Sequence, residues 1–144
     1  MDLLLHVLWG IMILGIDVYV ILGSILPDSL YLISVIEVKF KLEKLKNSKL
    51  FIWGERIHSF FFIPIILILL YVFIGAYVLI KIVVAYYLHL LFDIFTHRDF
   101  GPRFCWPFID SYFPRGVIQW ENTGTMFILY SLSIFALVLR FLII

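Results

Sequence analysis

His89 and Asp93 are the residues of this chain whose types and spacing point most directly to chemistry. They lie four residues apart inside an apolar run from 82 to 95, and on a helix this spacing places an imidazole and a carboxylate on one face. A carboxylate in the hydrocarbon of a membrane costs about 2.5–3.5 kcal/mol on insertion scales. The folded protein must therefore supply a partner that neutralises or coordinates this carboxylate.

Asp28 and His58 stand at the ends of two other apolar segments. If residues 60–95 fold back as a hairpin, His58 returns to the side of His89 and Asp93, and Asp28 reaches that side too. Imidazoles and carboxylates are ligands that zinc, manganese and iron accept. The sequence predicts a divalent metal site for zinc, manganese or iron at these four residues. A helix-packing hydrogen-bond network and a proton or ion pathway remain open as alternatives.

The composition is that of an integral membrane protein. The 144 residues are 64% hydrophobic and 15% charged, and the mean hydropathy is +1.10. We expect a single membrane-embedded helical domain over residues 1–144, with membrane lipids as partners. The net charge of +1 gives no reason to expect a nucleic-acid partner. A single cysteine, Cys105, excludes an intramolecular disulfide and a multi-thiolate metal site, and no pattern of a cleaved signal peptide is present.

The apolar segments predict an all-α fold. Residues 3–26 form either one spanning helix or two short helices that reverse near Gly15. Residues 60–95 as one straight helix would measure about 54 Å, beyond a hydrocarbon core of about 30 Å, so we expect a reversal near Gly75. Residues 125–144 form a final span. The predicted fold is two short helical hairpins followed by a C-terminal transmembrane helix.

Two polar segments predict the topology. Residues 39–49 carry five lysines, and the basic loop that we place at 39–56 is expected in the cytoplasm. The residues favour a solvated loop over a helix lying on anionic headgroups. Residues 97–122 are rich in proline and aromatic residues and predict an ordered loop at the headgroup level, with Asn122 capping the final helix. We expect a multi-pass protein of the cell inner or plasma membrane whose site faces the cytoplasm.

Four short segments together resemble a known family: His6 with Gly10, Gly23 to Asp28, His58–Ser59, and His89 to Thr96. They resemble the YdjM-type inner-membrane proteins, which are described as metal-dependent hydrolases and are distantly similar to zinc-dependent phospholipase C. The resemblance extends from His6 to about Trp120. It implies a helical metal site like that of phospholipase C.

The resemblance also implies specific ligands. Asp28, His58, His89 and Asp93 would hold one metal ion, and Asp93 would bridge to a second ion held partly by His6. A single straight helix would separate His6 from Asp28 by about 33 Å, so the resemblance favours the folded-back arrangement of the first apolar region. One or two ions are expected.

The predicted activity follows from the ligands. A metal ion at such a site activates water and polarises a phosphoryl or carbonyl oxygen. Glu55 and His97 are the candidates for general base or acid, and Arg56 and Arg98 are the candidates for holding a phosphate. The sequence therefore predicts a membrane-embedded metal-dependent hydrolase of phosphoester or lipid-like substrates. The alternative is a non-enzymatic membrane protein, structural or transporting ions or protons, whose His/Asp cluster is a polar network.

Overall fold

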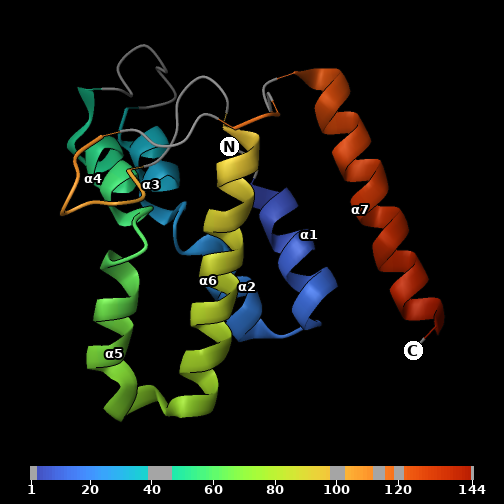
Figure 1. The fold of residues 1–144 in the computed structure, drawn as a ribbon, viewed down its shortest axis with the longest axis horizontal. Helices are drawn as coiled ribbons and strands as arrows, with labels where there is room; N and C mark the ends of the chain where they lie inside the picture. The colour runs from blue at the N-terminus through green and yellow to red at the C-terminus, as the bar shows by residue number, and fades with distance from the viewer. Residues whose placement is uncertain (1–2, 39–46, 98–102, 112–115, 119–121, 144) are drawn as a thin grey trace.

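The computed structural model describes residues 3–38, 47–97, 103–111, 116–118 and 122–143. These residues contain helices and no strand (Figure 1). In chain order the helices are α1 (Leu3–Leu14), α2 (Val18–Ile25), α3 (Ser29–Glu37), α4 (Lys49–Ile57), α5 (Phe62–Ile74), α6 (Ala76–Thr96) and α7 (Thr123–Ile143). The all-α prediction is confirmed.

The first apolar region is a helical hairpin. Helix α1 ends at Leu14, Gly15 adopts a φ of 96°, and α2 begins after Asp17. Glycine takes this left-handed conformation at little cost. The Asp17 carboxylate caps α2 by accepting a hydrogen bond of 2.8 Å from the Tyr19 amide. The folded-back arrangement of residues 3–26 is therefore the correct one of the two that the sequence left open.

The second hairpin and the final helix also agree with the sequence. Helices α5 and α6 run antiparallel and are joined at Gly75, whose φ is 74° (Figure 1). Asn122 caps α7, because its side-chain oxygen accepts hydrogen bonds from the amides of Gly124 (2.9 Å) and Thr125 (3.2 Å). The predicted two hairpins and C-terminal helix are confirmed.

Two short helices, α3 and α4, lie between the hairpins and had no counterpart in the sequence prediction. Residues 49–56, which we assigned to the basic loop, form most of α4. Ser48 starts this helix, since its hydroxyl accepts a hydrogen bond from the Phe51 amide. Parts of the two predicted loops lie outside the described residues: 39–46, 98–102, 112–115 and 119–121.

Helix α2 packs between α1 and α6, and small residues make this possible. A Cβ at Gly23 would lie 2.5 Å from the Ile82 carbonyl oxygen of α6, and one at Gly10 would lie 2.4 Å from the Ser24 hydroxyl of α2. Neither position has room for a larger residue. The close approach places the end of α2 directly against the polar residues of α6.

Helix α7 is attached to α1 at two points. The Trp9 indole donates a hydrogen bond of 2.7 Å to the Ser133 hydroxyl. The Arg140 guanidinium donates to the carbonyls of Ile11 and Met12 at the C-terminal end of α1, where carbonyls lack helical partners and attract a cation. The remaining surface of α7 is largely exposed and apolar.

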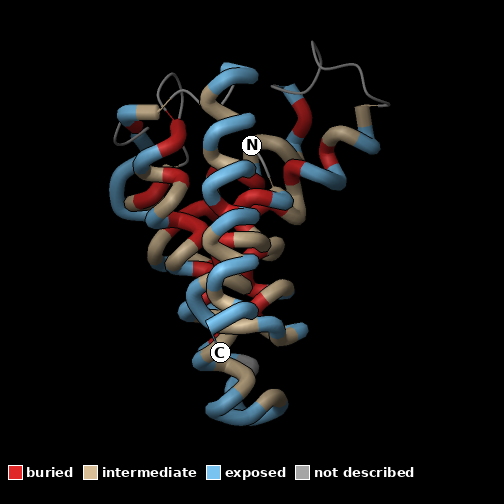
Figure 2. The backbone as a smooth tube through the Cα atoms, turned by 90° about the vertical axis from the view of Figure 1, so that its right-hand side faces the viewer, coloured by how far each residue is buried: buried red, intermediate tan, exposed pale blue. Residues whose placement is uncertain are grey.

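Helices α6 and α7 are long and apolar enough to cross a membrane. The bent pairs α2–α3 (58°) and α4–α5 (81°) would bring the number of spans to four if each pair counts as one. Buried residues gather in the half of the molecule away from the α5–α6 turn (Figure 2). That half contains the polar cluster described next.

Candidate metal centre

Five buried polar side chains converge from four segments. His6 comes from α1, Asp28 from the junction of α2 and α3, and His58 from the C-terminal end of α4. His89 and Asp93 lie on successive turns of α6. Each of these side chains is at most 4% exposed. The structure thus brings together all five residues that were predicted as metal ligands.

Four of them form one donor set, which we call the first set. The Nε2 atom of His58 lies 3.0 Å from Asp28 Oδ1 and 3.7 Å from Asp93 Oδ2. The Nε2 atom of His89 lies 3.5 Å and 3.2 Å from the same two oxygens. Ligands placed at about 2.0–2.2 Å around a tetrahedral ion are themselves about 3.3–3.6 Å apart. The ligand atoms of Asp28, His58 and His89 could hold a metal ion together.

Backbone carbonyls orient both imidazoles of the first set. The Nδ1 atom of His58 lies 2.8 Å from the Gly54 carbonyl oxygen, and that of His89 lies 2.7 Å from the Ser24 carbonyl oxygen. A carbonyl can only accept, so we infer that each Nδ1 carries a hydrogen and that Nε2 is the atom that each ring offers to a metal ion. Histidine ligands of metal ions are commonly oriented in this way. Both Nε2 atoms face carboxylate oxygens.

Hydrogen bonds satisfy only part of this arrangement. Among the described residues, His89 Nε2, Asp28 Oδ2 and both carboxylate oxygens of Asp93 have no hydrogen-bond partner. Of these short approaches between nitrogen and oxygen, only that of His58 Nε2 to Asp28 Oδ1, at 3.0 Å, has the geometry of a hydrogen bond. Lone pairs and negative charges crowded in this way repel one another unless a cation lies between them. One divalent ion would balance the charges of the two carboxylates.

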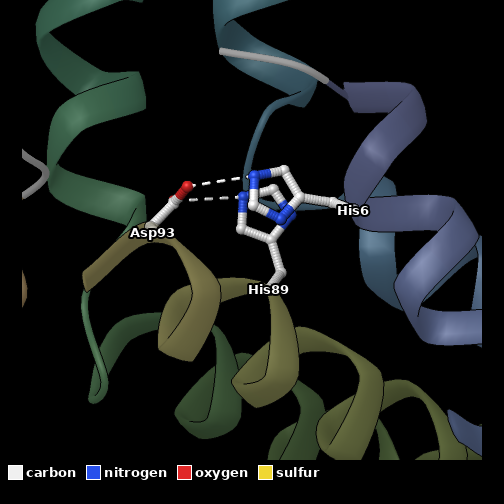
Figure 3. A group of neighbouring side chains, drawn as sticks. All are labelled: His6, His89 and Asp93. Atoms are coloured by element: carbon white, nitrogen blue, oxygen red, sulfur yellow. Dashed lines mark ion pairs between the residues drawn. The ribbon is translucent and has the colours of Figure 1, made fainter. Parts of the chain in front are cut away.

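The other oxygen of Asp93 faces a second group of residues. His6 Nε2 lies 3.1 Å from Asp93 Oδ1, and its ring stacks on that of His89 with 3.9 Å between ring centres (Figure 3). The ligand atoms of these three residues also lie close enough together to hold a metal ion. His97 approaches the same Asp93 oxygen with its Nδ1 at 3.2 Å. Asp93 thus presents one oxygen to each group, an arrangement that suits a bridging carboxylate.

Tyr86 holds the backbone on both sides of His58. This fully buried residue lies one turn before His89 on α6. Its hydroxyl lies 2.5 Å from the Ile57 carbonyl oxygen and 2.6 Å from that of Ser59. Carbonyls at the end of α4 lack helical partners, so this hydroxyl supplies the donor that they need. No sequence pattern links residues 29 positions apart, and Tyr86 was not predicted.

The residues predicted for acid–base catalysis and phosphate binding are placed differently. Glu55 is buried and pairs with Arg103, whose Nε lies 3.5 Å from Glu55 Oε2. His97 contacts Asp93 beside the cluster, so its role in proton transfer stays a prediction. Arg56 packs against tryptophan rings. Arg98 lies outside the described residues.

Comparison with known proteins supports the membrane assignment. A family model described as "YdjM inner membrane protein" matches residues 14–143, a range that contains the whole first set and leaves out His6. No curated protein and no solved structure matches the chain. The similarity to zinc-dependent phospholipase C and the cytoplasmic orientation stay predictions. With a match over nearly its entire length, the chain belongs to the YdjM family of inner membrane proteins.

Proposed function

We propose that the His/Asp cluster binds a divalent metal ion, zinc in the first instance, and that the protein is a membrane-embedded hydrolase of phosphoesters with lipid-like substrates. Asp28, His58, His89 and Asp93 hold the first ion. His6 and the second oxygen of Asp93 offer a place for another.

One observation carries this proposal. Two imidazoles, each fixed through Nδ1 by a backbone carbonyl, aim their Nε2 atoms at two buried carboxylates, and only one hydrogen bond, between His58 and Asp28, joins these rings to these carboxylates. A network that served only to join helices would place a hydrogen between each nitrogen and oxygen. Here Asp93 has no such hydrogen bond on either oxygen. The arrangement is that of ligands preorganised around a cation.

The residues of the chain then have distinct tasks in hydrolysis. A bound divalent ion supplies Lewis-acid activation of water and of a phosphoryl oxygen. The carbonyls of Ser24 and Gly54 hold His89 and His58 in the tautomer that binds the ion. The apolar helices around the cluster exclude bulk water.

A second candidate function is a non-enzymatic membrane protein in which the cluster, with or without a metal ion, only joins helices. The burial of the cluster favours this reading, because all five side chains are at most 4% exposed. Structural metal sites are closed, whereas catalytic sites keep one position for water or substrate.

Hydrolysis assays separate the two functions. Purified protein would be stripped with a chelator, reloaded with zinc or manganese, and tested on bis(p-nitrophenyl) phosphate and on phospholipid in mixed micelles. We expect metal-dependent hydrolysis in the wild type and in Cys105→Ala, which removes the only thiol. Asp93→Asn and His58→Ala should abolish it. Stoichiometric metal binding without hydrolysis of either substrate would refute the hydrolase and support the structural centre.

A further inference from the structure

Arg56 is a cation that lies against two tryptophans. The centre of its guanidinium lies 5.3 Å from the centre of the Trp53 ring and 5.8 Å from that of Trp106. The two indoles meet edge to face, with 6.1 Å between their centres. These distances are within the range of favourable cation–π contacts. We call Trp53, Arg56 and Trp106 the tryptophan cradle.

In the part of the chain that the structure describes, the cradle has no anionic partner. Among the described residues, no carboxylate forms an ion pair with Arg56, and its buried Nε atom has no hydrogen-bond partner. Arg103, on the neighbouring segment, contrasts with it: this guanidinium pairs with both Glu55 and Asp110. Burying part of a guanidinium without a hydrogen-bond acceptor raises the free energy of the folded protein. An anion is the missing component.

The position of the cradle points to the nature of this anion. Helix α4 meets α5 at 81°, so α4 lies along the membrane surface if α5 enters the bilayer. The apolar side chains of α5 support such an entry, since Ile68 and Leu69 are at least 65% exposed. At the start of α5, Phe62 packs on Trp106. Tryptophan and arginine at this depth lie at the level of lipid phosphates.

We propose that the tryptophan cradle binds the phosphate of an anionic phospholipid. The guanidinium fork donates to the phosphate oxygens in a bidentate manner, and the indoles contact the glycerol and upper acyl region. This site is distinct from the metal centre. The Arg56 guanidinium lies against Trp53 and Trp106, whereas the His58 ring faces Asp28.

Lipid binding by chelator-treated protein tests the proposal independently of the metal. Delipidated protein in non-ionic detergent would be titrated with dioleoylphosphatidylglycerol, with diolein, which lacks the phosphate, and with inorganic phosphate. Native mass spectrometry reports bound lipid, and tryptophan fluorescence reports occupancy of the cradle. The variants are Arg56→Gln, Arg56→Lys and Lys49→Gln. Lys49→Gln is the matched control, because it removes one exposed charge from the same helix.

We expect Arg56→Gln to weaken phosphatidylglycerol binding by about tenfold or more and Lys49→Gln to change it by no more than about twofold. Diolein binding should be equal in all variants. If Arg56→Gln fails to fold, the Arg56→Lys variant provides the test. Lysine keeps the positive charge but lacks the planar guanidinium, so this variant should bind the lipid more weakly than the wild type. Equal losses in the Arg56 and Lys49 variants, or unchanged binding in the Arg56 variants, would overturn the proposal. Displacement of the lipid by millimolar inorganic phosphate would overturn its assignment to a lipid.

Discussion

Replacing Tyr86 by phenylalanine tests how the metal centre is held in place. The change keeps the buried ring and removes only the hydroxyl, which lies 2.5 Å and 2.6 Å from the carbonyl oxygens on either side of His58. Without this donor the end of α4 can shift, and His58 loses its fixed position opposite Asp28. We therefore expect Tyr86→Phe to weaken metal binding without removing any ligand.

The magnitude follows from the role of groups that orient metal ligands. Loss of such a group typically weakens metal binding about 10–100-fold, which corresponds to about 1.4–2.7 kcal/mol. At saturating metal this amount is lost from the stability of the metal-bound protein. For a chain of this size it corresponds to a melting temperature about 3–11 °C lower. The missing hydrogen bond itself costs a further ~1 kcal/mol with or without metal.

Thermal unfolding in detergent, with and without chelator, separates the two contributions. Zinc affinity would be measured in parallel by competition with a fluorescent chelator. Tyr87→Phe is the matched control, because its hydroxyl donates to the Phe60 carbonyl (2.9 Å) next to the same segment but does not flank His58. We expect the chelator to lower the melting temperature of the wild type and of Tyr87→Phe by equal amounts, and that of Tyr86→Phe by less.

Two results would refute this reasoning. If Tyr86→Phe lowers the melting temperature equally with and without chelator, the hydroxyl contributes only to packing of the fold. If both tyrosine variants weaken zinc binding to the same extent, the effect does not depend on the position of His58.

Two other predictions concern helix packing and are checked by thermal unfolding of the purified variants. Gly23→Ala should destabilise the protein by about 1–3 kcal/mol, because the new methyl group meets the Ile82 backbone. Gly75→Ala has open space around it and should show only the backbone cost of a φ of 74° with a ψ of 157°, about 1–3 kcal/mol. A loss at Gly75 beyond this range would contradict the packing argument. Ser133→Ala should cost about 0.6–1.7 kcal/mol, because it removes the acceptor of the Trp9 indole, and an unchanged melting temperature would show that this bond does not hold α7 to α1.

The fold could be predicted where length and composition set strong limits. A run of 36 mostly apolar residues cannot cross a bilayer as one straight helix, and Gly75, the one glycine in this run, marks the place where it reverses. Helix α4 was missed because its lysine and arginine residues resemble a solvated loop. Ser48 is the N-cap of this helix, but it stands among other polar residues, so the sequence does not single it out as a helix start.

The ligands of the candidate site were predictable because charged and polar residues are rare in apolar segments. The groups that hold these ligands were not. The carbonyls of Ser24 and Gly54 carry no side-chain signal, and Tyr86 looks like one aromatic residue among many. Lys81 of α6 forms an ion pair with Asp17, at the start of α2. The sequence could not predict this ion pair, because it depends on how α2 packs on α6.

X-ray absorption at the metal edge, combined with elemental analysis of purified protein, tests the central claim most directly. The account predicts one or two divalent ions per chain, with nitrogen and oxygen ligands at about 2.0–2.2 Å and no sulfur. The ion of the first set should be lost from His89→Ala and retained by Cys105→Ala. Wild-type protein that takes up neither zinc, manganese nor iron, or a His89→Ala variant that binds the metal as the wild type does, would contradict the account.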